Sequence, residues 1–337
     1  ITLTQGSGAN VILAAGVTKM IYADGAGSGA ALVDALVGLE VGTTLYIKNA
    51  ATGDDSTAQL FLQTAEADIQ ANDVLGSINF QAPNEGTGTD AITAAARIQA
   101  ISEGDFSASN NATSLEFRTA SSGAVGTAAQ GGRVRLTSDA NLIVKDMTTA
   151  DGSSPTITLQ TGDTDIAAND ILGSINFQAP DEAAGTDAIA VAASIQAVSE
   201  GDFSSSSNAS SIKFTTASSA ASAIGGTDGG EMSLLSNGAL LIRDKRTNGA
   251  PTLALESGRT DVSDGEVLAG IEMYAPVEAS GTDAILVGAA IKAIADADFS
   301  SSSNATSLQF QTGASETATT KMTLSSGGNL TVTGSIS

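Results

Sequence analysis

Three copies of one pattern constrain this chain more than any other feature of its 337 residues. Between residues 65–106 and 162–203, 30 of 42 positions are identical. The repeat is also marked by three prolines that are spaced 97 and 96 residues apart: Pro83, Pro180 and Pro276. Self-similarity at a fixed period is the signature of a repeat architecture, so one segment has been duplicated.

The period predicts how the chain divides into domains. We expect an N-terminal module over residues 1–56 and three repeats over 57–154, 155–250 and 251–337. Ordinary solenoid repeats are about 20–50 residues long, which is shorter than these copies. Each copy is therefore predicted to be a small multi-strand domain, and the copies are predicted to be near-identical and stacked along one axis.

Alternation of side chains predicts β-strands within each copy. In the stretch 92–100, one parity carries Ile92, Ile98 and three alanines, and the other carries Thr93, Ala95, Arg97 and Gln99. A period of two with β-branched anchors favours a strand. Alanine is also the best helix former, so a helix is the alternative. A second strand is predicted around Leu115 and Phe117, with counterparts in the other copies.

Each copy is predicted to end in a hairpin. In the second copy, Met232 and Leu234 precede Asn237-Gly238, and Leu240 and Ile242 follow. Asn-Gly favours a two-residue turn because both residues tolerate positive φ. The third copy repeats the pattern around Gly327-Gly328.

The first 56 residues do not follow the repeat. Ser28 is able to cap one short helix that carries Leu32, Leu36 and Leu39 at helical spacing. Residues 44–47 are expected to form a strand that leads into the repeats. The chain begins with Ile1, so we expect a segment or a processed product of something longer.

The composition argues against enzyme classes and cofactors. The chain has no cysteine, histidine or tryptophan, which excludes disulfides, thiolate or imidazole zinc sites and Ser-His or Cys-His catalysis. Carboxylate pairs for glycoside hydrolysis lack the aromatic platforms that usually hold sugars, since the chain has only three tyrosines. We therefore expect no enzyme activity, no catalytic residues, no cofactor and no resident metal.

The net charge limits the possible partners. Fourteen basic and 37 acidic residues give a charge of −23, which disfavours nucleic acids and anionic membrane surfaces. Apolar runs such as 284–291 are far shorter than the ~20 residues that span a bilayer, so no membrane insertion is expected.

Two polar motifs recur in phase with the repeat. The acidic loops contain Asp163, Asp165, Asn169 and Asp170, with Glu200 and Asp202 further along the chain. Two alternatives exist for these loops: they bind calcium, or they are solvated turns that protect strand edges. The third copy replaces Asp163 with Arg259. Asn-Ala-Ser/Thr triplets begin at Asn111, Asn208 and Asn304, and they match the glycosylation acceptor pattern. We favour turn-forming asparagines there.

The repeat also resembles a known class of protein. The block from GSINFQAP to SSSSNAS, residues 173–210, and KMTLSSGGNLTVTGSI, residues 321–336, resemble bacteriophage tail fibre and related virion appendage proteins, of the marine or cyanobacterial phage type. In that family, a hairpin like that of Met322, Leu324, Gly328, Asn329 and Leu330 often precedes a C-terminal tip or an autocleaving chaperone domain. This chain ends at Ser337, so we expect another part of the appendage to bind the receptor.

The resemblance implies an all-β fibrous homotrimer, located in the virion and extracellular. Its implied partners are its own copies, other virion tail or adaptor proteins, and a host surface receptor through the assembled fibre. It implies no catalytic residues. A bacterial extracellular fibril or surface adhesin is the alternative function, and an enzyme such as a polysaccharide depolymerase is a more distant one.

The residues themselves also favour a parallel homotrimer. Only 4% of the chain is aromatic, so one copy has little large apolar surface to offset its chain entropy. Alanine-rich strand faces suit three strands that approach one axis. We predict a shared trimer interior formed by Ile98, Ile195 and Ile291 with their alanine neighbours, together with Phe117, Phe214 and Phe310.

Overall fold

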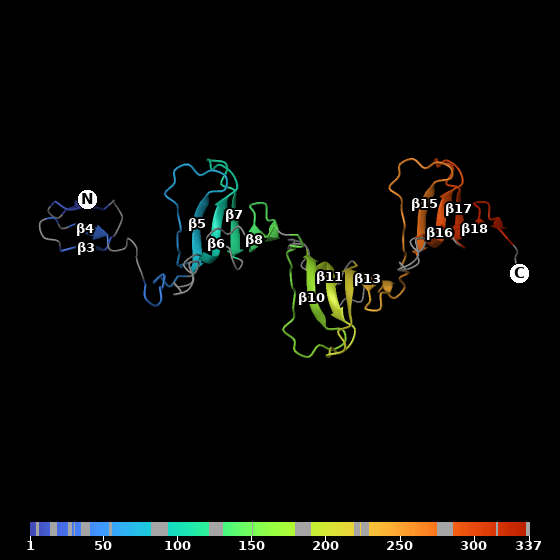
Figure 1. The fold of residues 1–337 in the computed structure, drawn as a ribbon, viewed down its shortest axis with the longest axis horizontal. Coiled ribbons are helices and arrows are strands. Elements are labelled where there is room, and N and C mark those ends of the chain that lie inside the picture. The colour runs from blue at the N-terminus through green and yellow to red at the C-terminus, as the bar shows by residue number, and fades with distance from the viewer. Residues whose placement is uncertain are drawn as a thin grey trace. The chain divides into compact units, whose positions relative to one another are not determined.

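The computed structural model describes most of the chain as β-strands and connecting segments (Figure 1). No α-helix occurs in the described part, and thus none that could cross a membrane. The chain divides into two compact units, Ile1–Ile157 and Thr158–Ser337. The described residues are 1–4, 7–13, 19–25, 29, 31–34, 41–53, 56–81, 94–120, 131–149, 151–178, 190–218, 223, 229–274, 286–314 and 316–334.

Each repeat folds into one five-stranded antiparallel sheet whose strands are neighbours in chain order. The first sheet contains β5 (Val74–Gln81), β6 (Ala94–Ser102), β7 (Thr113–Thr119), β8 (Gly132–Leu136) and β9 (Leu142–Asp146). The second contains β10 (Ile171–Gln178), β11 (Val191–Ser199), β12 (Ser210–Thr216), β13 (Gly230–Leu234) and β14 (Leu240–Asp244). The third contains β15 (Val267–Tyr274), β16 (Val287–Ala295), β17 (Thr306–Thr312), β18 (Thr319–Leu324) and β19 (Leu330–Val332).

These sheets confirm the all-β fold and the strands predicted from alternation. The alanine-rich stretches form β6, β11 and β16 rather than helices, because each pairs with strands on both sides. Each sheet lies inside one predicted repeat, while the domain borders and the stacking of the repeats stay predictions. The three repeat prolines, and Ile92 with its counterparts, lie outside the described residues.

The N-terminal module is also built of strands. β1 (Thr2–Leu3) pairs with β2 (Val11–Ile12), and β3 (Ile21–Ala23) pairs with β4 (Leu32–Asp34). The expected helix is wrong at Leu32: its backbone N–H donates to the carbonyl of Ala9 at 3.0 Å, and it lies opposite Ala23. Cross-strand pairing here outweighs the helical spacing of the leucines. Ser28, Leu36 and Leu39 lie outside the described residues.

The strand expected at residues 44–47 is also wrong. This segment pairs with no described strand, and Tyr46 is 86% exposed. A β-branched and aromatic composition favours a strand only where a partner strand or a packed face is present.

The terminal hairpins are confirmed, but their turns are longer than predicted. The N–H of Leu235 donates to the carbonyl of Ala239 at 2.9 Å, which leaves three residues in the loop rather than two. Within this loop only Gly238 has positive φ, at 82°. The same position holds Gly328 with φ 80° in the third repeat and Ala140 with φ 61° in the first. Alanine is thus held in the left-handed region that glycine occupies in the other two hairpins.

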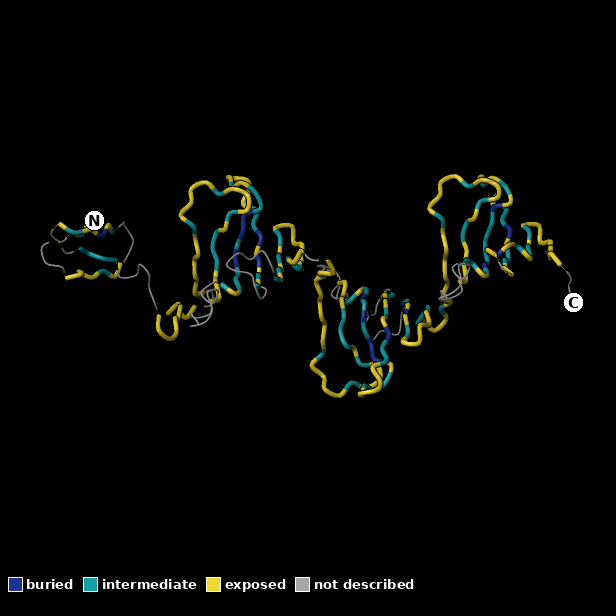
Figure 2. Tube along the Cα trace, viewed as in Figure 1, coloured by how far each residue is buried: buried dark blue, intermediate teal, exposed yellow. Residues whose placement is uncertain are grey.

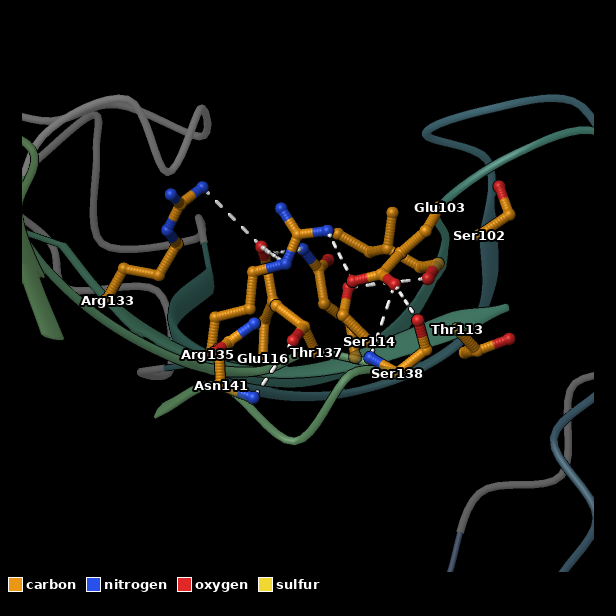
Figure 3. Close-up of polar contacts among 12 residues, drawn as sticks. Ser102, Glu103, Thr113, Ser114, Glu116, Arg133, Arg135, Thr137, Ser138 and Asn141 are labelled. Atoms are coloured by element: carbon orange, nitrogen blue, oxygen red, sulfur yellow. Dashed lines mark hydrogen bonds and ion pairs between the residues drawn. The ribbon is translucent and has the colours of Figure 1, made fainter. Parts of the chain in front are cut away.

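A carboxylate at the end of the second strand of each sheet caps this turn. Glu103 accepts hydrogen bonds from the hydroxyl and, at 3.2 Å, from the backbone N–H of Ser138 (Figure 3). Glu200 binds Ser236 in the same way, and Asp296 accepts the N–H of Ser326 at 3.1 Å. The serine hydroxyl is the main cause that lowers the pKa of Glu103 and of Glu200 below the ordinary value of 4.5.

Replacing Ala140 with glycine should raise the free energy of unfolding of the first sheet by about 0.5–1 kcal/mol. The left-handed conformation costs an L-residue roughly 1–2 kcal/mol, which exceeds the roughly 0.5–1 kcal/mol entropy cost of glycine. Gly238→Ala is the matched control, and it should destabilise the second sheet. Urea denaturation measures both changes, and a destabilised Ala140→Gly variant would contradict this account of the turn.

The carboxylate caps should make stability depend on pH in the acid range. Because folding lowers the pKa of Glu103 and Glu200, their contribution is present above the unfolded pKa of about 4.5 and is lost as the pH falls through the lower folded values. The temperature of the unfolding midpoint should therefore decrease as the pH is lowered from about 5 to about 3, the range in which carboxylates take up protons. Glu103→Gln combined with Glu200→Gln should flatten this fall, and an unchanged profile would count against the caps.

Candidate assembly interface

The register of each sheet aligns large apolar side chains in a row across all five strands. In the first sheet the row is Ile78, Ile98, Phe117, Val134 and Val144. The second sheet has Ile175, Ile195, Phe214, Met232 and Ile242. The third has Ile271, Ile291, Phe310, Met322 and Val332. Directly opposite residues share a face, so each row is continuous.

The six residues predicted for the trimer interior lie in these rows as three cross-strand pairs. Ile98 lies opposite Phe117, Ile195 opposite Phe214, and Ile291 opposite Phe310. A second apolar row runs beside each central row, as with Ala100, Leu115, Leu136 and Leu142 in the first sheet. We call the surface formed by these two rows the apolar face of each sheet. The structure thus gives the predicted residues a common face, and their role in a trimer stays a prediction.

The apolar face is largely uncovered in the single chain. Phe117 is 49% exposed, Phe214 42%, and Leu142 66%. In the third sheet Leu324 and Leu330 are likewise exposed. Soluble monomers rarely expose contiguous apolar patches of more than a few hundred Å², so this face is a candidate interaction surface.

The opposite face of each sheet is polar and yet holds most of the buried positions. Ser114, Ser211 and Ser307 occur at equivalent places in the three repeats, and each is at most 2% exposed. The hydroxyls of the first two donate to backbone carbonyls across the sheet at 3.4 Å. In the first sheet the buried positions gather on β6 and β7 (Figure 2). This arrangement reverses the usual one, in which the apolar face of a sheet is the covered face.

The apolar face is hollowed at one end in the first two sheets. A cavity of about 570 Å³ lies among Phe80, Phe117, Val144 and Pro155. A cavity of about 510 Å³ lies at the matching place, where Phe214, Ile242 and Pro251 form part of the wall. On the rim of the second cavity, hydrogen bonding from Arg246 lowers the pKa of Asp244 to about 2.

A buried carboxylate distinguishes the polar face of the first sheet. Glu116 is 1% exposed and lies among three arginines, of which Figure 3 shows Arg133 and Arg135. Its carboxylate oxygens lie 2.5 Å from Nη2 of Arg118, 3.5 Å from Nη1 of Arg133 and 3.7 Å from Nε of Arg135. It also accepts the amide N–H of Gln99 at 3.1 Å. Several donors around one buried charge satisfy its lone pairs and offset the cost of removing it from water.

The same face carries a row of four cations. Arg97, Arg118, Arg133 and Lys145 lie opposite one another on β6, β7, β8 and β9. Two unit charges 5 Å apart repel by about 1 kcal/mol in water and by about 3 kcal/mol at an effective dielectric constant of 20. Like charges directly opposite each other destabilise a sheet, so this row is an unusual feature in a strongly acidic chain.

The acidic loops and the asparagine triplets serve local turns. Asp163 accepts the N–H of Asp165 at 3.0 Å, and Asp170 accepts that of Ala167 at 2.7 Å. No group of three or more potential metal ligands occurs within the described ranges. Each triplet asparagine is exposed, and its backbone carbonyl accepts a hydrogen bond from the hydroxyl of the residue two positions later at 2.9–3.1 Å.

The register was needed to find two of these features, and a third had a signal in the sequence. Arg97 was placed among the polar side chains of its strand, but the cation row was not predicted. Arg118, Arg133 and Lys145 join Arg97 only when the strands pair. The buried Glu116 was missed for the same reason. The carboxylate caps had a signal in the sequence: Glu103, Glu200 and Asp296 keep the spacings of 97 and 96 residues.

Two solved structures are among those that are similar to this chain. One is the carboxy-terminal domain of the bacteriophage T5 L-shaped tail fibre with its intramolecular chaperone domain, at 17% identity and a TM-score of 0.27, covering 70% of each chain. The other is the carboxy-terminal domain of the same L-shaped tail fibre, at 15% identity and a TM-score of 0.25, covering 71% of this chain and 99% of that chain. No protein-family model and no curated protein matches the chain.

Proposed function

We propose that this chain forms the structural shaft of a phage tail fibre or related virion appendage, which projects the receptor-binding end towards the host surface. The observation that carries the proposal is the apolar face, which is present in all three repeats and uncovered in each. The repeat residues that resemble virion appendage proteins support the same reading. The marine or cyanobacterial phage type stays a prediction from those residues.

We propose that each apolar face packs against the same face of two further copies, in a parallel homotrimer. The two apolar rows carry no charged side chain, so chains with a charge of −23 each can meet there without opposing their charges. The alanines of the second strand, such as Ala96 and Ala100, lie on this face beside Ile98. Small side chains at the centre allow three sheets to approach one axis.

A trimer of this kind also accounts for the polar face. In an assembly with the apolar faces inside, the polar faces, whose central positions are already covered within each chain, lie on the outside. The carboxylate caps and the exposed serine loops then form the outer surface. In such a shaft, the partners beyond the trimer are other tail or adaptor proteins at its ends, and contact with a host receptor is made through the assembled fibre.

A bacterial extracellular fibril or surface adhesin is the second candidate function, since an uncovered apolar face suits any fibre. Immunogold electron microscopy with antibodies against this chain separates the two. We expect label along appendages of virus particles from the source culture. Label confined to the cell surface would favour the fibril. New reducing ends after incubation with host polysaccharide would instead indicate a depolymerase.

Placing a charge on the apolar face should dissociate the assembly. The wild-type chain should have a mass near 100 kDa by light scattering, which is three times 33.2 kDa. Phe117→Glu combined with Phe214→Glu should shift the mass towards 33.2 kDa, because a buried unpaired carboxylate costs several kcal/mol. The matched control, Phe117→Leu with Phe214→Leu, should keep the trimer.

The single-chain exposure of these phenylalanines makes the test informative. Because both are more than 40% exposed in one chain, the glutamate variants should keep their β-rich circular dichroism. A wild-type mass of one or two chains would reject the trimer. A glutamate variant that folds and keeps the wild-type mass would place the interface elsewhere.

A further inference from the structure

The polar face of the first sheet holds more positive charge than its described residues neutralise. Among the described residues, five cations, Arg135 and the four members of the row, face two carboxylates, Glu103 and Glu116. Arg118, Arg133 and Arg135 share Glu116, and Arg135 also lies 3.0 Å from Glu103. Arg97 and Lys145 form no ion pair with any residue that the structure describes. Counted over the described residues, an excess of three positive charges therefore stays on this face.

Hydrogen-bond donors on the same face also lack acceptors. The Nε atoms of Arg133 and Arg135 are buried and donate to no acceptor among the described residues. Within the described part of the chain, the guanidinium of Arg97 donates only to the side-chain oxygen of Gln99, at 3.5 Å. A buried donor without an acceptor is costly, and native structures nearly always supply one from protein, water or a ligand.

We propose that Arg97, Arg118, Arg133 and Lys145 form a binding site for oxyanion groups such as phosphate, sulfate or carboxylate. The planar fork of arginine matches these groups and binds them with two parallel hydrogen bonds. Neighbouring strands lie about 4.8 Å apart, so the row extends over roughly 14 Å. A row of this length accepts several oxyanion groups side by side, either as free ions or as groups on one acidic polymer.

The site belongs to the first repeat and does not follow from the sheet architecture. In the second sheet, the positions equivalent to the cation row are occupied by Ser194, Thr215, Glu231 and Arg243. Glu231 pairs there with Arg243 at 4.0 Å. The third sheet has Ala290, Gln311 and Thr320 there. Because the row lies on the face opposite to Phe117, this inference does not depend on the proposed assembly.

Calorimetric titration of the full-length chain at low chloride concentration tests the site. Inorganic phosphate is one probe, dextran sulfate is a second, and neutral dextran is the control polymer. We expect saturable binding of phosphate and of dextran sulfate by the wild type. Arg97→Gln and Lys145→Gln should each weaken it about tenfold, as expected for the loss of one charge-assisted hydrogen bond. The matched control in the second sheet, Arg243→Gln, should bind like the wild type.

Each result decides the proposal. Binding of dextran sulfate without binding of phosphate would assign the site to polymer-borne groups and support it. The proposal is overturned if the wild type binds neither probe, or if Lys145→Gln binds both as the wild type does. Lys145 is exposed, so this variant should fold even where an arginine variant does not. Light scattering of Lys145→Gln completes the test. If the variant loses the assembled mass and the wild type binds no phosphate, the proposal is overturned and the row is assigned to contact between copies.

Discussion

The structure depends on apolar sheet faces that the chain does not cover by itself. Each sheet presents a central row of large aliphatic and aromatic side chains, with Ile98 and Phe117 at the middle of the first. A five-stranded meander is a single layer, and an apolar sheet face needs a second layer to cover it. Burial of apolar area is the main favourable term in folding, so a single copy forgoes much of it. The proposed association of copies would supply the missing burial.

The alternation of side chains explains how one repeat supplies both faces. A side-chain period of two places Ile98 and Ala100 on the apolar face and Gln99 on the polar one. A shift by one residue would exchange the faces, so the register must be fixed. The capped hairpin turns help to fix it, since Glu103 binds Ser138 from the end of β6. The equivalent contacts in the other repeats place this constraint in all three sheets.

Much of this could be predicted from the sequence, because duplication makes the pattern visible three times. The strands at Ile98 and Phe117 follow from alternation, and the hairpin at Gly238 follows from its turn residues. The helix at Leu32 and the strand at residues 44–47 were wrong, because neither region has the repeated pattern that guided the other predictions. Local spacing alone does not show whether a partner strand is present.

Alternation alone could not predict which residues from different strands lie side by side. Arg97 and Lys145 are 48 positions apart in the sequence, and only the pairing of β6 through β9 brings them into one row. Duplicated sheets share their apolar rows, as expected if the proposed assembly buries those positions in every copy. Their polar faces are free to diverge, and in the first repeat that face has become basic around Glu116. A feature that one of three otherwise equivalent sheets carries is therefore a candidate for a function other than the proposed assembly.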